Sequence, residues 1–119
     1  MHTKIKTFAN ACKKLGISTA LPNVEMMPKH LQKQVIADYK LVVIAEALND
    51  GWKPNWNDTS EYKYYPWFKM SSSGSEFSYY VYDFGYASTV VGSRLVFKSR
   101  ELAEYAGKQF EAEYKEFYT

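Results

Sequence analysis

LQKQVIADYKLVVIAEAL, residues 31–48, is the stretch of the sequence that decides the fold. Its apolar residues recur with helical spacing over about five turns, and residues 41–45 are apolar on every side. A helix of that composition is normally buried at the centre of a domain. Pro28 fits its first position, where a missing N–H costs nothing, and Asn49-Asp50-Gly51 ends it. The pattern therefore predicts a central helix over about residues 28–50.

A shorter helix is predicted before the central one, over about residues 3–15. Gly16 stands where a helix commonly ends in a left-handed residue. Cys12 lies on the apolar stripe of this helix, so we expect a core residue there rather than a nucleophile. The stripe, with the spacing of one helix face, comprises Ile5, Phe8, Ala9, Cys12 and Leu15.

Beyond the central helix, residues 52–97 have the composition of strands. Fourteen of these 46 residues are aromatic, and Ser- and Gly-containing turns separate the aromatic and β-branched clusters. Three strands are predicted, over about residues 62–70, 77–87 and 93–98. Pro66 removes a donor from the first of them, so that strand lies at an edge or breaks there.

The last predicted helix covers about residues 99–118, with Ser99 as its cap and Glu101 at its positive end. Short connections between consecutive strands favour an antiparallel arrangement. The 119 residues match one domain in size. The sequence thus predicts a single α+β domain, residues 1–119, in which helices pack on one face of a three-stranded antiparallel β-meander in the order α-α-β-β-β-α.

Several classes of protein are disfavoured by the inventory of residues. With Cys12 as its one cysteine, the chain forms no intramolecular disulfide and no zinc site of several cysteines. No secretion signal and no apolar run long enough for a bilayer is visible, so we expect a cytoplasmic protein without a membrane partner. No catalytic motif is recognisable. We therefore expect no enzyme activity, no cofactor and no metal.

Charge is spread unevenly along the chain. The net charge is only +2, yet residues 1–40 carry seven lysines against Glu25 and Asp38. A solvated lysine face on the first helix explains this excess, and an anion-binding end of the molecule is the alternative. The sequence leaves that choice open.

The aromatic region supplies the candidate binding residues. Trp52 and Trp56 lie four residues apart in a predicted loop. Either they form an exposed binding edge, since Trp is enriched at interface hot spots, or they fold back into the core. Rings accompanied by Lys and Arg also resemble a sheet that stacks the bases of single-stranded nucleic acid, although residues 52–98 have a net charge of only +1. Cross-strand packing is the structural explanation. The candidate surface comprises Trp52, Trp56, Lys63, Tyr64, Trp67, Lys69, Tyr80, Tyr82, Tyr86, Arg94 and Lys98.

A resemblance to known proteins covers most of the chain. Leu48-Asn49-Asp50-Gly51-Trp52-Lys53-Pro54-Asn55-Trp56-Asn57-Asp58, Lys63-Tyr64-Tyr65-Pro66-Trp67-Phe68, Val91-Gly92-Ser93-Arg94-Leu95 and the run from Phe97 to Phe110 are similar to small proteins encoded by phages and mobile elements of anaerobic gut bacteria. That group has no assigned function. The resemblance therefore implies a bacterial cytoplasmic setting and transfers no catalytic or binding residue.

These patterns lead to one expected function and one alternative. The expected function is a non-enzymatic, phage-related accessory or structural protein, an interaction module that binds another protein through the aromatic sheet face or the loop of Trp52 and Trp56. The alternative is single-stranded nucleic-acid binding through ring stacking and Lys or Arg contacts with phosphates. Self-association through an edge strand is a further option. Solvent exposure of the rings distinguishes these options.

Overall fold

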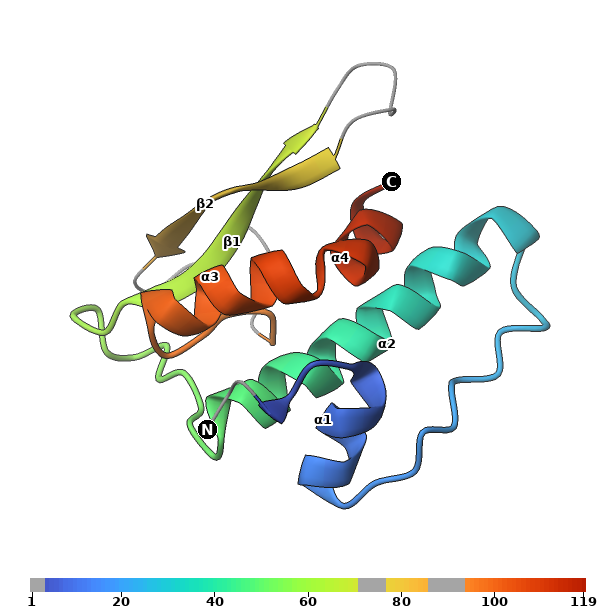
Figure 1. The fold of residues 1–119 in the computed structure, drawn as a ribbon, viewed down its shortest axis with the longest axis horizontal. Coiled ribbons are helices and arrows are strands. Elements are labelled where there is room, and N and C mark those ends of the chain that lie inside the picture. The colour runs from blue at the N-terminus through green and yellow to red at the C-terminus, as the bar shows by residue number, and fades with distance from the viewer. Residues whose placement is uncertain (1–3, 71–76, 86–93) are drawn as a thin grey trace.

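The residues that the structure describes form four helices and one antiparallel hairpin, shown in Figure 1. The structure is a computed structural model that describes residues 4–70, 77–85 and 94–119, without the side chains of residues 69, 70, 77–81, 83 and 85. The elements are α1 (Phe8–Leu15), α2 (Lys29–Asn49), β1 (Lys63–Met70), β2 (Phe77–Gly85), α3 (Arg100–Gln109) and α4 (Glu111–Tyr118).

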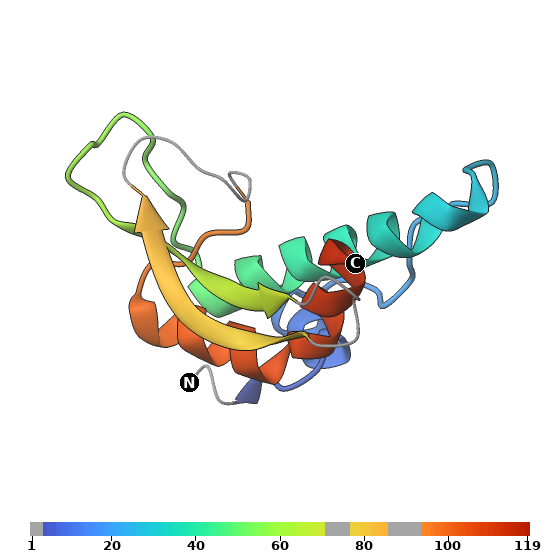
Figure 2. The same cartoon turned by 90° about the horizontal axis from the view of Figure 1, so that it is seen from above.

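The elements are stacked in tiers. The β1–β2 hairpin lies over α3, α4 contacts both β2 and α2, and α1 packs against α2 (Figures 1 and 2). Apolar side chains from all four helices join one core, which also takes up the buried Leu95 and Phe97 from the segment before α3. Tyr64, Phe68 and Tyr82 of the hairpin pack against this core. The face of the hairpin that is turned toward the helices therefore covers one side of the core.

The central helix is confirmed as α2. Leu41, Ile44 and Ala45 are each 1% exposed, as expected for a segment that is apolar on every side. Two left-handed residues end the helix, Asp50 with φ 47° and Gly51 with φ 89°. Over the described part of the chain, no helix is both long and apolar enough to cross a membrane.

The first helix is shorter than predicted, because it begins at Phe8 rather than near residue 3. Thr7 determines this start, since its hydroxyl accepts a hydrogen bond of 3.0 Å from the backbone N–H of Asn10. Gly16 ends α1 with φ 70°, a value that favours glycine. Cys12 is fully buried, which confirms its predicted place in the core.

The last predicted helix is divided in two at Phe110. The backbone there leaves the helical region, with φ −110° and ψ 30°. The hydrogen bonds continue across the bend, from Phe110 N–H to Ala106 O at 2.9 Å and from Tyr114 N–H to Phe110 O at 3.1 Å. Because of the bend, α4 contacts α2 while the Tyr114 ring meets Phe68 of β1 at a centroid distance of 4.7 Å.

The predicted three-stranded antiparallel meander is wrong. Among the described residues the sheet has two strands, β1 and β2, paired antiparallel from Lys63–Gly85 to Met70–Phe77. Residues 94–98, expected in a third strand beside the second, make one isolated bridge between Phe97 and Tyr64 of β1 instead. Residues 86, 87 and 93 of the predicted strands lie outside the described part of the chain.

Pro66 gives a physical reason why this pairing stops after one bridge. Tyr64 and Phe97 exchange two hydrogen bonds, of 3.0 and 2.7 Å. The next pair of the same ladder would use the N–H of the residue two further along β1, and that residue is Pro66, which has none. In the other direction the chain enters α3 at its cap, Ser99. The pairing with β1 therefore cannot continue on either side of Phe97.

Buried tyrosines predict a loss of stability in alkali. Burial raises the pKa of Tyr114 far above its ordinary value of 10.0. Above that pH the unfolded chain releases the phenol proton while the folded chain keeps it, so the free energy of unfolding falls as pH rises, by up to about 1.4 kcal/mol per pH unit. Urea unfolding of the wild type and of Tyr114→Phe at pH 8 and pH 11 measures this term. We expect a smaller alkaline loss in the variant.

The matched control is Tyr62→Phe, because the Tyr62 side chain is 43% exposed. Its alkaline loss should equal that of the wild type. An equal loss in Tyr114→Phe would instead show that the phenol of Tyr114 ionises normally in the folded protein.

Candidate binding groove

One groove collects the two tryptophans singled out in the sequence. It has a volume of about 320 Å³ and lies where the end of α2, the loop 51–62 and residues 94–96 meet. We call it the Trp groove. Its lining residues are Val42, Glu46 and Asn49 from α2, Gly51, Trp52, Lys53, Pro54 and Trp56 from the loop, and Arg94 and Val96 from the segment before α3.

The helical period of α2 explains its contribution to this groove. Val42, Glu46 and Asn49 follow the i, i+4, i+7 spacing that places side chains on one helix face. Trp52, Pro54 and Trp56 alternate with the more exposed Lys53 and Asn55, and all three are half-buried. The rings are therefore neither core residues nor free in solvent, and each presents part of its surface to the groove.

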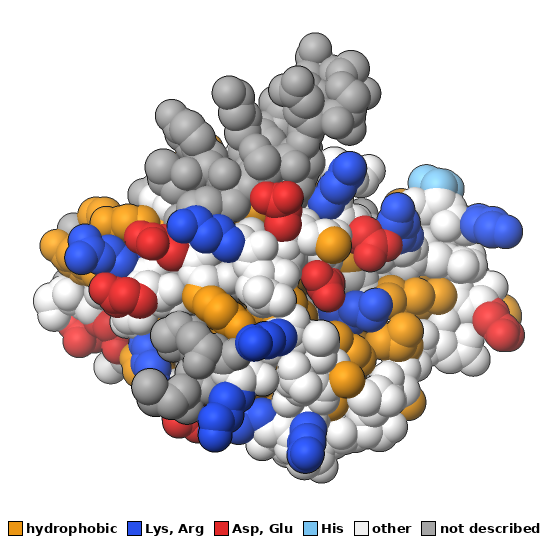
Figure 3. Space-filling view, viewed as in Figure 1, with side chains coloured by type: hydrophobic (Ala, Val, Ile, Leu, Met, Phe, Trp, Pro, Cys, Tyr) orange, Lys and Arg blue, Asp and Glu red, His pale blue; other side chains and the backbone are white. Residues whose placement is uncertain are grey.

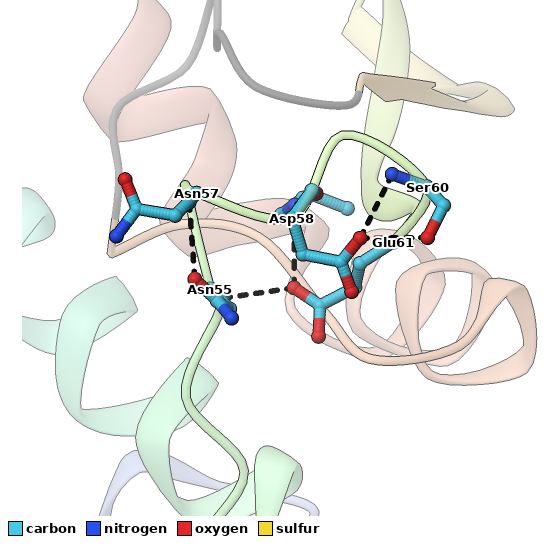
Figure 4. A network of polar contacts seen from close by, with 6 residues as sticks. Asn55, Asn57, Asp58, Ser60 and Glu61 are labelled. Carbon is cyan, nitrogen blue, oxygen red and sulfur yellow. Dashed lines mark hydrogen bonds and ion pairs between the residues drawn. The ribbon is translucent and has the colours of Figure 1, made fainter.

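Polar contacts inside the loop hold its shape (Figure 4). The N–H of Asn55 donates to Glu61 Oε1 at 2.8 Å, and the N–H of Asn57 donates to Asn55 Oδ1 at 3.0 Å. The hydroxyl and N–H of Ser60 both donate to Asp58 Oδ1, and they lower the pKa of that carboxyl. Such side-chain-to-backbone bonds stabilise turns without regular structure.

A buried lysine lies under Trp56. The Lys63 side chain is 1% exposed, and its Nζ donates to the backbone oxygen of Asp58 at 2.9 Å. The same ammonium lies 3.3 Å from Glu61 Oε1 and 5.3 Å from the centre of the Trp56 ring. A cation over an indole face is attracted by the ring quadrupole. Lys63 therefore holds Asp58 and Glu61 of the loop together beneath the Trp56 ring.

Asn49 holds the opposite wall of the groove. Its side-chain amide donates from Nδ2 to Val96 O at 2.9 Å, and its Oδ1 accepts from the N–H of Lys98 at 3.1 Å. Because Phe97 is paired with Tyr64 on the other side, the segment 96–98 is bonded on both edges. Asn49 thereby fixes the backbone at Val96, which lines the groove.

The other predicted binding residues are dispersed. The rings of Tyr64 and Tyr82, 5.8 Å apart between centroids, are half-buried against the core, and Trp67 is 46% exposed but outside the Trp groove. Lys98 lines a different groove. Lys69 and Tyr80 are described by backbone only, in β1 and β2, and Tyr86 lies outside the described residues.

Sequence reasoning missed the roles of the two residues that organise the groove. The sequence pattern places Asn49 only in a helix stop, and it includes Lys63 in the candidate surface as an exposed cation rather than a buried one. One signal for Asn49 was available, a residue with both a donor and an acceptor at the end of an apolar helix. Nothing local distinguishes Lys63 from the exposed lysines near it, because its partners are turn residues whose path depends on the fold.

The described residues form a small helical fold covered by a hairpin, with the aromatic-lined Trp groove on its surface. The chain matches no protein-family model, and comparison with curated proteins and with solved structures also finds no match. Among the described residues, no three His, Cys, Asp or Glu side chains gather as a metal site would require. The groove is therefore interpreted from its own chemistry, two indole faces beside one guanidinium, one ammonium and one carboxylate.

Proposed function

We propose that this protein is a non-enzymatic interaction module that binds an extended segment of a partner protein in the Trp groove. The observation that supports this proposal is the convergence of two half-buried tryptophans and Pro54 on one concave surface. Large, rigid aromatic side chains that already line a pocket bind with little loss of conformational entropy, and Trp is the residue type most enriched at interface hot spots.

The charges around the groove specify the partner further. Lys53 and Arg94 are exposed at its rim, while Glu46 is the one carboxylate among the described residues that line it. Opposite charge steers a partner to its site and fixes its register. The proposed partner segment therefore combines apolar or proline side chains, which contact the indoles, with Asp or Glu, which face Arg94 and Lys53.

The geometry favours this partner over single-stranded nucleic acid. A strand bound by stacking needs cations beside the rings to follow its phosphates. Lys63 is buried under Trp56 and bonded inside the loop, and Lys98 lines another groove. Of the predicted cations whose side chains are described, Arg94 is therefore the one that lines the Trp groove. The proposed setting is the cytoplasm of a bacterial host, in association with a phage or mobile element, and it rests on the sequence resemblance alone.

Binding of labelled peptides tests the proposed function. Fluorescence anisotropy is measured with one pool of short peptides that combines Asp and Glu with Pro, Leu and Trp, and with a matched pool in which Lys replaces the acids. We expect the acidic pool to bind more tightly. Trp52→Ala should weaken this binding at least about tenfold, a cost of about 1.4 kcal/mol.

Trp67→Ala is the matched control, because Trp67 is exposed and does not line the groove. It should change the dissociation constant less than about twofold. Equal weakening by both Trp variants would contradict binding in the Trp groove. Salt-sensitive binding of a single-stranded oligonucleotide that also depends on Trp52, with no peptide binding, would support the nucleic-acid alternative instead.

A further inference from the structure

A second groove, larger than the first, lies between α1, the end of α2 and the start of α3. Its volume is about 710 Å³, within the range of small-molecule sites. Four lysines line it, Lys4, Lys13, Lys14 and Lys98, against one carboxylate, Asp50. Its floor includes the buried side chains of Ile5, Leu48 and Leu102. We call it the Lys groove.

The lysines come from three separate parts of the chain. Lys13 and Lys14 belong to the last turn of α1, Lys4 precedes that helix, and Lys98 directly precedes Ser99, the cap of α3. Figure 3 shows basic side chains gathered over α1 and the nearby end of α2, where few acidic ones accompany them. Only the tertiary structure places these charges around one concavity.

Helix electrostatics account for part of this cluster and not for the rest. Cations in the last turn of a helix favour its negative end, which explains Lys13 and Lys14. Lys4 lies outside α1, and Lys98 lies at the positive end of α3, where another cation is unfavourable. Among the described residues no carboxylate is within ion-pair distance of Lys4, Lys13 or Lys98. Three of the four lysines that line the groove thus have no ion-pair partner among the described residues.

Asp50 neutralises the fourth lysine of the groove, Lys14. Its Oδ1 lies 2.9 Å from Lys14 Nζ, and Lys14, with a smaller contribution from Lys98, lowers the pKa of the Asp50 carboxyl. Asp50 therefore stays ionised at neutral pH and competes with any anion for Lys14. Removing its charge should make the groove more receptive to anions, a direction opposite to that of the lysine variants.

From this arrangement we propose that the Lys groove binds a small molecule with two or more linked phosphate groups. Lysine recognises phosphate as a mobile point charge, and several ammonium groups around one concavity match an anion of several charges. Among the described residues that line the groove there is no aromatic ring, so they offer no stacking platform for the bases of a nucleic acid. The apolar floor accommodates a non-polar part of the same ligand.

Isothermal titration calorimetry with tripolyphosphate at low salt tests the proposal. We expect binding that weakens as salt rises. Lys98→Gln and Lys13→Gln should each raise the dissociation constant about fivefold, the loss of roughly one charged contact. Asp50→Asn should lower it about threefold. Asn tolerates the left-handed conformation that position 50 adopts, so this variant keeps the helix end intact.

Lys29→Gln is the matched control, because Lys29 is an exposed lysine of α2 outside the Lys groove. It should leave the dissociation constant within twofold of the wild-type value. The proposal is overturned by the absence of binding at low salt, or by a Lys29→Gln effect as large as that of Lys98→Gln. Tighter binding of a single-stranded oligonucleotide than of tripolyphosphate would also overturn it, in favour of nucleic acid.

Discussion

Replacing Asn49 by Ala is expected to lower the free energy of unfolding by about 3–4 kcal/mol. The Asn49 side chain is buried and satisfies two backbone groups at once, the oxygen of Val96 and the N–H of Lys98. Ala fills less space and bonds to neither, and each buried backbone group left without a partner costs about 1–3 kcal/mol. Ala is also the best helix former, so a loss of helix propensity in α2 does not explain the effect.

Urea unfolding measures the stability change, and amide hydrogen exchange identifies its origin. In Asn49→Ala the Lys98 amide should exchange faster relative to the amides of the α2 interior, because the hydrogen bond that protects it is gone. Gln34→Ala, on an exposed position of the same helix, serves as the control. It should change the free energy of unfolding by less than about 0.5 kcal/mol. Unchanged protection of Lys98 would contradict the role assigned to Asn49.

Loss of the Asn49 side chain should disturb both grooves. Val96 lines the Trp groove and Lys98 lines the Lys groove, and Asn49 bonds to the backbone of each. We therefore expect Asn49→Ala to weaken peptide binding and tripolyphosphate binding together. A variant of Trp52 or of Lys98 should affect only its own groove, since each side chain lines one groove and not the other.

Replacing Lys63 by Met is expected to cost about 2–3 kcal/mol of stability. Met keeps most of the length of the side chain but removes the ammonium, so Asp58 O and Glu61 Oε1 lose their contact with it. Breaking a buried ion pair from one side costs about 3–5 kcal/mol. We expect less, because the Glu61 side chain is 25% exposed and water takes over part of the lost interaction.

A control variant and a fluorescence measurement separate this effect from a general loss of charge. Lys53→Met removes an exposed lysine of the same loop and should change stability by less than about 0.5 kcal/mol. In Lys63→Met, the fluorescence of Trp56 should also change, since the cation 5.3 Å from its ring centre is lost; a Trp67→Phe background reduces the signal from outside the groove. Equal unfolding midpoints for Lys63→Met and wild type would show that Lys63 does not hold the loop.

Local patterns were sufficient for the central helix and the hairpin strands, and they placed the other helices only approximately. The 3.6-residue period predicted α2, and Gly16 marked the end of α1 because the left-handed conformation there favours glycine. The start of α1 was misplaced because apolar periodicity continues through Ile5, whereas the cap at Thr7 begins the helix after it. The bend at Phe110 left no local signal that periodicity could detect, since both halves share one apolar stripe.

The prediction of a third strand was wrong because strand propensity does not take the availability of a partner strand into account. Residues 94–98 have a suitable composition, but a strand requires a partner edge with free donors and acceptors. Pro66 removes a donor from that edge, and Asn49, 47 residues away from Val96 in sequence, takes the backbone groups on the opposite side. The sequence marks Pro66 as an edge signal. It does not show that residues 94–98 meet β1 at that same edge.

For the binding site, the sequence identified Trp52, Trp56 and Arg94 as candidates but not that they share one groove. It showed an excess of lysine near the N-terminus but not the concavity that Lys98 completes. The sequence by itself determined where helices and hairpin strands form, because periodicity, caps and turn residues act within a few positions along the chain. Only the tertiary structure decided which polar groups are satisfied and which charges meet, because partners such as Asn49 and Val96, or Lys14 and Asp50, lie tens of residues apart and come together only when the core is packed.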